Sequence, residues 1–79
     1  MQTLLIKNGF KFFFYANEHL PVHIHVVKGE GYAKVNLNNM EVVENYFTRN
    51  QLKIVLRITE ENKEFFRKKW NEYFKSHKS

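Results

Sequence analysis

The hydrophobic pattern of this chain changes once, near Thr48, and that change constrains the fold more than any other feature. Before Thr48, short apolar runs are separated by the turn sequences Asn8-Gly9, Gly29-Glu30-Gly31 and Asn38-Asn39. Beyond it, apolar side chains recur at helical spacing as far as Phe74. Strands joined by such short turns are normally antiparallel neighbours. The sequence therefore predicts an α+β fold, an antiparallel meander sheet of about four strands with a long C-terminal helix packed on one face.

A chain of 79 residues has room for one hydrophobic core, so we expect a single domain over residues 1–79. We place the sheet within residues 1–45, the helix over residues 48–75 and a frayed tail at residues 76–79. Thr48 is a good N-cap residue and marks the start of the helix.

Two details of this fold stay open at the level of the sequence. Residues 40–43 are predicted as a short extended piece after the Asn38-Asn39 turn. The helical phase continues through residues 59–62, which favours one helix, although a cap-like residue in that segment could break it. The apolar stripe of the helix is expected to meet the sheet face that carries Phe12, Ile24, Val26 and Val35.

The chain contains no cysteine, which excludes disulfides and thiolate zinc sites. Secreted domains of this size usually carry such cross-links. The apolar run at the N-terminus is far too short for a signal peptide, and no segment reaches transmembrane length. The sequence therefore predicts a cytoplasmic protein without a membrane partner.

The net charge of +5 is concentrated in the C-terminal part of the chain. Residues 1–47 contain four basic and four acidic side chains, and the remaining residues contain nine basic and four acidic ones. This asymmetry favours an anionic partner, either RNA, DNA or an acidic protein. The alternative is a solvated helix face whose charges pair at i,i+4 spacing. The candidate anion-binding or nucleic-acid-binding residues are Lys28, Lys34, Lys53, Arg57 and Lys68.

Three histidines, His19, His23 and His25, lie within seven residues of sequence. Strand alternation places His23 and His25 on one side of the sheet, about 6.5–7 Å apart at Cα. Two imidazoles at that spacing can converge on one metal ion. His19 would supply a third ligand from the preceding loop, and Glu18 or Glu30 a carboxylate. Such a set suits a divalent transition metal (Zn²⁺, Fe²⁺, Ni²⁺ or Mn²⁺) with one position open for water.

Two other interpretations of the histidines remain open. His23 and His25 could be catalytic as general acid and base without a metal, for example in RNA cleavage, with Lys28 or Lys34 stabilising charge on the phosphate. They could also be half-exposed strand residues that form hydrogen bonds to a neighbouring strand or loop. Nucleophilic catalysis has little support, because cysteine is absent and the serines, Ser76 and Ser79, both lie in the tail.

The segment Glu18-His19-Leu20-Pro21-Val22-His23-Ile24-His25 resembles the core motif of a family of small prokaryotic proteins, the domain of unknown function family 4160. Further matches are Gly29-Glu30 followed by Ala33-Lys34, and Trp70-Asn71 on the charged helix. Val22 departs from the pattern, since many relatives carry a second proline there, which alters the stiffness of the loop. The resemblance implies that the three motif histidines are functional and that Pro21 shapes the loop that presents His19.

The family has no established activity, but its members resemble parts of two-gene units beside another small domain. The resemblance therefore implies an interaction module, a component of a toxin–antitoxin-like pair that binds a small cognate protein encoded nearby, or RNA. The alternative function is a metal-dependent or histidine-dependent hydrolase or nuclease that uses His19, His23 and His25. A further alternative is a homodimer in which the histidines form a pH-sensitive interface and exposed sheet edges pair.

Overall fold

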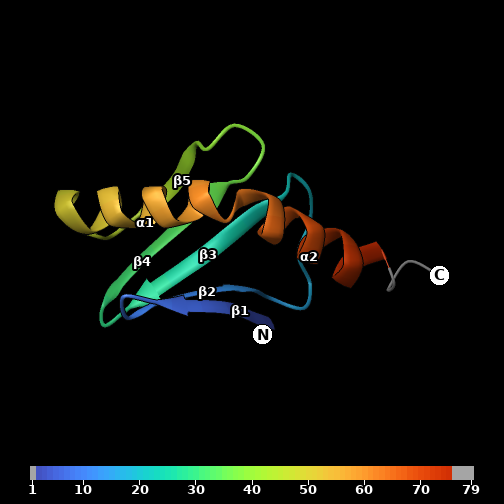
Figure 1. The fold of residues 1–79 in the computed structure, drawn as a ribbon, viewed down its shortest axis with the longest axis horizontal. Helices are drawn as coiled ribbons and strands as arrows, with labels where there is room; N and C mark the ends of the chain where they lie inside the picture. Colours follow the sequence, from blue (N-terminus) through green and yellow to red (C-terminus); the bar gives the residue numbers. More distant parts are fainter. Residues whose placement is uncertain (1, 76–79) are drawn as a thin grey trace.

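The computed structural model describes residues 2–75, which form a five-stranded antiparallel sheet followed by two α-helices (Figure 1). The strands lie side by side in the order in which they occur in the sequence, so the predicted meander is confirmed. The expected frayed tail at residues 76–79 lies outside the described residues. The strands are β1 (Gln2–Lys7), β2 (Phe10–Phe14), β3 (His23–Lys28), β4 (Gly31–Asn36) and β5 (Val42–Asn45).

The prediction of about four strands is corrected by β5, which pairs antiparallel with β4 along one edge of the sheet. Lys34 of β4 lies opposite Glu44 of β5, and the register shifts between Lys34 and Val35. The strand has four residues and its pairing is irregular, so it leaves little alternation to detect in the sequence. At the other edge, Asn8 and Gly9 join β1 to β2 with positive φ angles of 54° and 81°, as the Asn-Gly signal predicts.

The prediction of one long helix is also corrected, because the helix breaks at Asn62. Helix α1 (Arg49–Glu61) begins at the N-cap Thr48, whose hydroxyl accepts a hydrogen bond from the backbone N–H of Gln51. At its C-terminal end the Asn62 side chain donates to the Ile58 carbonyl at 2.8 Å. A side chain that bonds to the backbone in this way competes with continuation of the helix. Helix α2 (Lys63–Lys75) follows immediately.

The hydrophobic core lies between one face of the sheet and the two helices, which run across it (Figure 1). The ring of Phe12 stacks on Phe66 of α2 with centroids 5.5 Å apart, and the ring of Phe14 meets Trp70 at 5.1 Å. The sheet residues predicted to meet the helices do so, which confirms the assignment of faces. The buried sheet residues of this core are Phe10, Phe12, Phe14, Ile24, Val26, Ala33, Val35 and Leu37.

The other face of the sheet is not covered by a helix (Figure 1). Alternation along β3 directs His23 and His25 to this face, beside the side chains of Phe13 on β2 and Tyr32 on β4. Within residues 2–75, neither helix has the length and apolar character that crossing a bilayer requires.

Candidate metal centre

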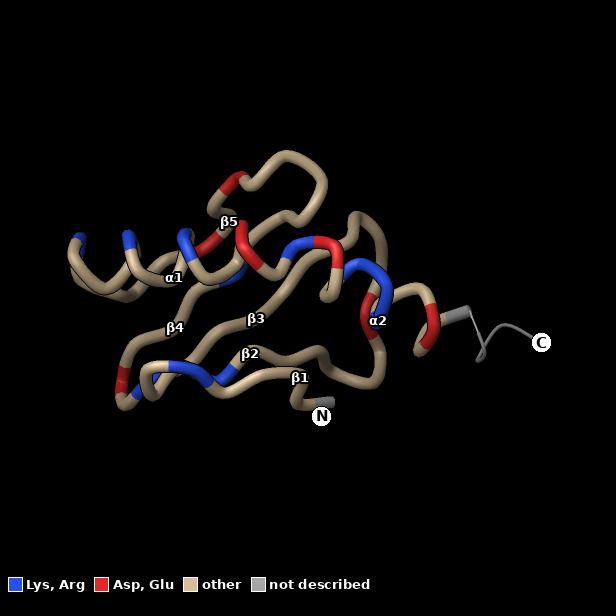
Figure 2. The backbone as a smooth tube through the Cα atoms, in the orientation of Figure 1, with Lys and Arg blue, Asp and Glu red and all other residues tan. Residues whose placement is uncertain are grey.

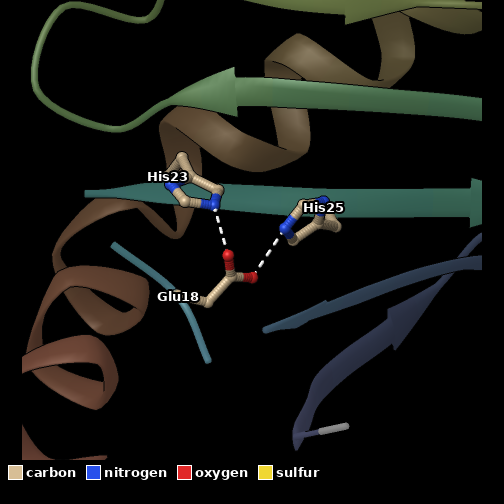
Figure 3. A group of neighbouring side chains, drawn as sticks. All are labelled: Glu18, His23 and His25. Atoms are coloured by element: carbon tan, nitrogen blue, oxygen red, sulfur yellow. Dashed lines mark hydrogen bonds and ion pairs between the residues drawn. The ribbon is translucent and has the colours of Figure 1, made fainter. Parts of the chain in front are cut away.

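The side chains of Glu18, His23 and His25 meet on the helix-free face of the sheet (Figure 3). The two histidines extend from β3, and Glu18 approaches them from the loop of residues 15–22. One carboxylate oxygen of Glu18 lies 2.8 Å from Nε2 of His23, and the other lies 2.6 Å from Nε2 of His25. Three potential ligand atoms of these residues lie within 4.8 Å of one another. Of the predicted metal ligands, these three come together.

Both histidines are buried, with only 4% of His23 and 5% of His25 exposed. The alternative of half-exposed strand residues is therefore wrong about exposure, whereas the hydrogen bonds to a neighbouring strand and to a loop that it included are present. Aromatic rings enclose them: Phe13 stacks on His25 at 5.4 Å, Tyr15 meets it edge-on at 4.7 Å, and Trp70 lies 5.1 Å from His23. The cluster is held in an environment with little water, where charges interact strongly.

The second nitrogen of each imidazole has its own partner, which fixes the orientation of the ring. Nδ1 of His23 lies 2.8 Å from the carbonyl oxygen of Pro21, and a carbonyl can only accept, so Nδ1 is the donor. Nδ1 of His25 lies 2.8 Å from the hydroxyl of Tyr32. Both Nε2 atoms consequently face the carboxylate. Partners of this kind are typical of histidines that bind metals, because they orient the ligand and raise its basicity.

The contact between His23 and Glu18 needs a hydrogen atom or a metal ion between its two atoms. With Nδ1 as the donor to Pro21, a neutral His23 directs the lone pair of Nε2 at a carboxylate oxygen. A separation of 2.8 Å is favourable when a proton, carried by either residue, or a metal ion lies between these atoms. The geometry therefore provides a position that a metal ion can occupy in place of this proton.

The ionisation of Glu18 and His25 follows from their surroundings. Burial raises the pKa of the Glu18 carboxyl, but the N–H donated by Tyr15 at 2.8 Å, together with His25 and His23, outweighs burial and lowers that pKa below its usual value. For His25, burial lowers the pKa, and the attraction of Glu18 offsets this only in part. Burial and the nearby Glu44 raise the pKa of Tyr32 to about 12, so its hydroxyl stays protonated. The hydroxyl can donate to Nδ1 of His25 when Nε2 carries the ring proton, and it accepts from Nδ1 when Nε2 binds a metal.

A cavity of about 250 Å³ opens beside the cluster. Glu18 and His23 form part of its wall, so the cluster borders on a space that a small molecule could enter. Lys34 and Asn36 of β4 and His19 of the loop supply further polar groups. The apolar lining residues are Leu20, Pro21 and Val43.

Two of the predicted metal ligands lie outside the cluster. His19 is exposed and lines the cavity, but the group of converging ligand atoms found in residues 2–75 does not include it. Glu30 is exposed in the turn between β3 and β4. This turn follows the last residue of β3, whereas His23 is its first residue. Because a six-residue strand separates the two positions, Glu30 is about 20 Å away from His23.

Of the predicted anion-binding residues, Lys34 lies at the cavity and the other four lie elsewhere. Lys28 donates to the Asn8 carbonyl at 3.0 Å and covers the ring of Phe10 at the far end of the sheet. Lys53 and Arg57 are exposed on α1, where Figure 2 shows basic residues at regular intervals, and Lys68 is exposed on α2. Among the described residues, the expected i,i+4 pairs are not formed; the helices carry a 3.6 Å ion pair between Lys69 and Glu72.

Sequence reasoning missed several groups that hold the cluster in place: Tyr32, the carbonyl of Pro21, the N–H of Tyr15, and Asn36 in the cavity wall. Tyr32 and Asn36 could have been found from the hairpin. The short turn between β3 and β4 places His25 opposite Lys34 and His23 opposite Asn36, so these positions share one face. The two backbone groups belong to an irregular loop and leave no periodic signal.

Comparison with known proteins places the chain in a family but not beside a characterised relative. No curated protein and no solved structure matches it. The model of one family, described as a domain of unknown function (DUF4160), matches residues 9–71, which include strands β2–β5, helix α1 and the cluster of Glu18, His23 and His25. The chain therefore belongs to the DUF4160 family.

Proposed function

We propose that Glu18, His23 and His25 bind one divalent transition-metal ion and that the protein is a metal-dependent hydrolase. The convergence of two Nε2 atoms on one half-buried carboxylate, with both Nδ1 atoms held by other partners, carries this proposal. Two histidines and a carboxylate are a ligand set found in hydrolytic zinc sites.

The observed distances suit such an ion. In a tetrahedral zinc site with bonds of about 2.0 Å, neighbouring ligand atoms lie about 3.3 Å apart. The two Nε2–carboxylate distances, 2.8 and 2.6 Å, need to lengthen by less than about 1 Å to reach this separation. The three ligand atoms lie within 4.8 Å of one another, so the widest separation needs to shorten by at most about 1.5 Å. The metal would replace the proton that the contact between His23 and Glu18 now requires. When bound, it would activate a water molecule for attack on the substrate.

The protein contributes the remaining requirements of a hydrolytic site. Pro21 and Tyr32 fix the two imidazole rings, and the N–H of Tyr15 fixes the carboxylate. The aromatic rings of Phe13 and Tyr15 exclude water from one side of the cluster, while the cavity admits it from the other. Three protein ligands leave one coordination position open.

Metal content is the first measurement. We expect the natively purified, untagged protein to contain close to one equivalent of a transition metal, or to take up one equivalent of Zn²⁺, Mn²⁺ or Ni²⁺ in a calorimetric titration. Metal at 100 times its Kd would stabilise the fold by about 2.7 kcal/mol, which a thermal melt detects.

Matched variants separate the cluster from its surroundings. His25→Ala should abolish metal binding, and Glu18→Gln should weaken it at least tenfold with little change in shape. His19→Ala is the control, because this exposed residue lies outside the cluster. If none of the three metals binds the wild-type protein, or if Glu18→Gln binds as tightly as the wild type, the proposal fails.

Activity is tested with chromogenic phosphodiester, phosphomonoester and carboxylic ester substrates. Hydrolysis of at least one class should require added metal, persist in Glu30→Gln, whose side chain lies outside both the cluster and the cavity, and be lost in Glu18→Gln. A reaction that continues in the presence of a chelator would favour acid–base catalysis by His23 and His25 without a metal.

The second candidate function is an interaction module of a toxin–antitoxin-like pair, and the free edge of β5 favours it. Strand β5 ends the sheet, and the side chains of Val43 and Tyr46 at this edge are 50% and 72% exposed. An unpaired edge with exposed apolar groups can accept an extended segment of a partner protein. The resemblance discussed above suggests the product of a neighbouring gene as this partner.

Co-expression with that neighbouring product tests the second candidate. A stable complex that Val43→Asp disrupts, while metal binding is retained, would support it. Failure to form a complex, together with no binding of RNA or DNA at low salt, would exclude it; binding to nucleic acid alone should weaken steeply as salt rises.

A further inference from the structure

We infer that the cavity beside the cluster is a binding site for a phosphate group, formed by Lys34 and Asn36. Its occupancy would make phosphoesters the substrates of the hydrolase. The substrate class rests on the proposed function, whereas phosphate binding itself does not.

Lys34 provides the main positive charge of this site. It lies half-buried on β4 opposite His25 and lines the cavity. Within residues 2–75, its ammonium group forms no hydrogen bond and no ion pair within 4.0 Å, although Glu44 is its neighbour across the strands. A half-buried charge without a partner is costly, and an anion in the cavity would supply one.

Asn36 provides a donor of fixed orientation. Its Oδ1 atom accepts hydrogen bonds from the backbone N–H groups of Asn38 and Asn39, at 2.7 and 3.3 Å. These bonds fix the amide so that the carbonyl side faces the turn and the NH₂ group remains available to the cavity that Asn36 lines. Amide NH₂ groups bind phosphate oxygens without carrying charge.

The charges around the cavity are compatible with an anion. Its titratable lining residues are Glu18, His19, His23 and Lys34. The Glu18 carboxylate is the acidic group among them, and it already accepts hydrogen bonds from Tyr15, His23 and His25. With a metal ion in the cluster, the surroundings would become more positive still.

The size and lining of the cavity suit a ligand that has one charged part and one less polar part. A volume of about 250 Å³ exceeds that of several water molecules of about 30 Å³ each, so it holds a phosphate group and part of its ester. The polar residues Lys34 and Asn36 lie on β4, whereas Leu20, Pro21 and Val43 provide apolar lining. A phosphoester has this combination of a charged group and a less polar substituent.

Titration with inorganic phosphate, followed by amide chemical shifts, tests the site in the wild-type protein with and without Zn²⁺. Lys34→Met should weaken phosphate binding at least tenfold and leave metal binding unchanged. Asn36→Asp should have a similar effect, because it keeps the oxygen that the turn requires and replaces the NH₂ donor with an acceptor. Lys11→Met is the matched control, since Lys11 is also half-buried on a strand but does not line the cavity.

The outcomes separate this inference from the proposed function. If the protein binds no metal but binds phosphate in a way that depends on Lys34, the phosphate-binding site (the subsite) is supported and the hydrolase proposal is rejected. Metal binding without phosphate binding, or equal losses in Lys34→Met and Lys11→Met, would overturn the subsite. Competition by a nucleoside monophosphate or by a short oligonucleotide without terminal phosphates identifies the source of the phosphate, and competition by neither overturns the assignment of nucleic-acid phosphoesters as its ligands.

Discussion

Glu18 connects the loop of residues 15–22 to the sheet, and its carboxylate is the acceptor on which the cluster depends. It receives hydrogen bonds from the backbone N–H of Tyr15 and from the imidazoles of His23 and His25. The sequence predicted that His23 and His25 would lie on one side of the sheet, because alternation along a strand is regular, and it offered Glu18 or Glu30 as the carboxylate. It could not show that His19 lies outside the group of converging ligand atoms, because a loop has no such period.

The metal-free protein should lose stability as the pH falls from 8 to 4. The pKa values of Glu18 and His25 are both lowered in the folded state, from 4.5 and 6.5 respectively. The unfolded chain therefore binds more protons, and the free energy of unfolding decreases with falling pH, first below about 6.5 and again below about 4.5. Urea unfolding at a series of pH values measures this dependence.

The variant Glu18→Gln is the control for the pH dependence. It removes one of the two titrating groups, so the loss below pH 5 should become shallower than in the wild type. An identical profile in the variant would assign the acid sensitivity to other carboxyl groups.

Gly31→Ala should destabilise the fold by about 1–3 kcal/mol. A Cβ atom at this position would overlap the ring of Phe47, which is buried and packs edge-on against Phe10 at 5.4 Å. Denaturant unfolding of Gly31→Ala, Phe47→Leu and the double variant measures the effect. The double variant should cost less than the sum of the two, because the smaller side chain relieves the overlap. Strictly additive costs would show that Phe47 is not the obstacle.

The helices and strands differ in how well they could be predicted. The start of α1 was predictable because Thr48 and Gln51 form a capping box, a local arrangement visible in four residues of sequence. The break at Asn62 was not resolved, because the apolar positions of α1 and α2 remain in phase across it and the deciding hydrogen bond to Ile58 belongs to a single side chain. The short strand β5 was missed as a strand because its pairing with β4 is irregular.

Thr48→Ala should lower the stability of the protein by about 1 kcal/mol. The variant loses the hydroxyl that accepts from the N–H of Gln51 at 3.2 Å, which leaves a helix donor without its cap. Thermal unfolding measures the change. Asn50→Ala is the control, since Asn50 is exposed one residue into the same turn and should change stability by less than about 0.5 kcal/mol. Equal effects of the two variants would rule out the cap as the cause.

At the scale of the whole molecule, the two layers could be predicted from hydrophobic period alone. Alternation in the strands and helical spacing beyond Thr48 assign one apolar face to each layer, and the two faces can only be buried against each other. The helix-free face was harder to interpret, because the two histidines are buried there by the loop that carries Tyr15 and by Trp70 of α2. That burial depends on tertiary contacts, which no local pattern reports.

Phe66→Ala should remove a large part of the stability of the protein. Truncation of a buried phenylalanine costs about 3–5 kcal/mol, and a domain of this size has a total stability of about 4–12 kcal/mol. Phe66 is fully buried and stacks on Phe12, so its loss opens the contact between the two layers.

The adjacent residue provides a matched control for Phe66→Ala. Phe65 has the same side chain on the same turn of α2 but is 40% exposed, so Phe65→Ala should cost less than about 1.5 kcal/mol. Circular dichroism and urea unfolding compare the two variants. Similar losses would contradict the assignment of α2 faces to core and solvent.

The position of Trp70 gives this protein an optical probe of its own. It is the single tryptophan of the chain, and its indole contacts Phe14 of the core on one side and the His23 imidazole on the other, at 5.1 Å each. Fluorescence from this indole is quenched by a positively charged imidazole at contact distance, so its intensity should respond to the charge on His23 while its wavelength reports burial. An emission spectrum recorded during a metal titration would therefore separate occupation of the cluster from unfolding of the protein, without any label.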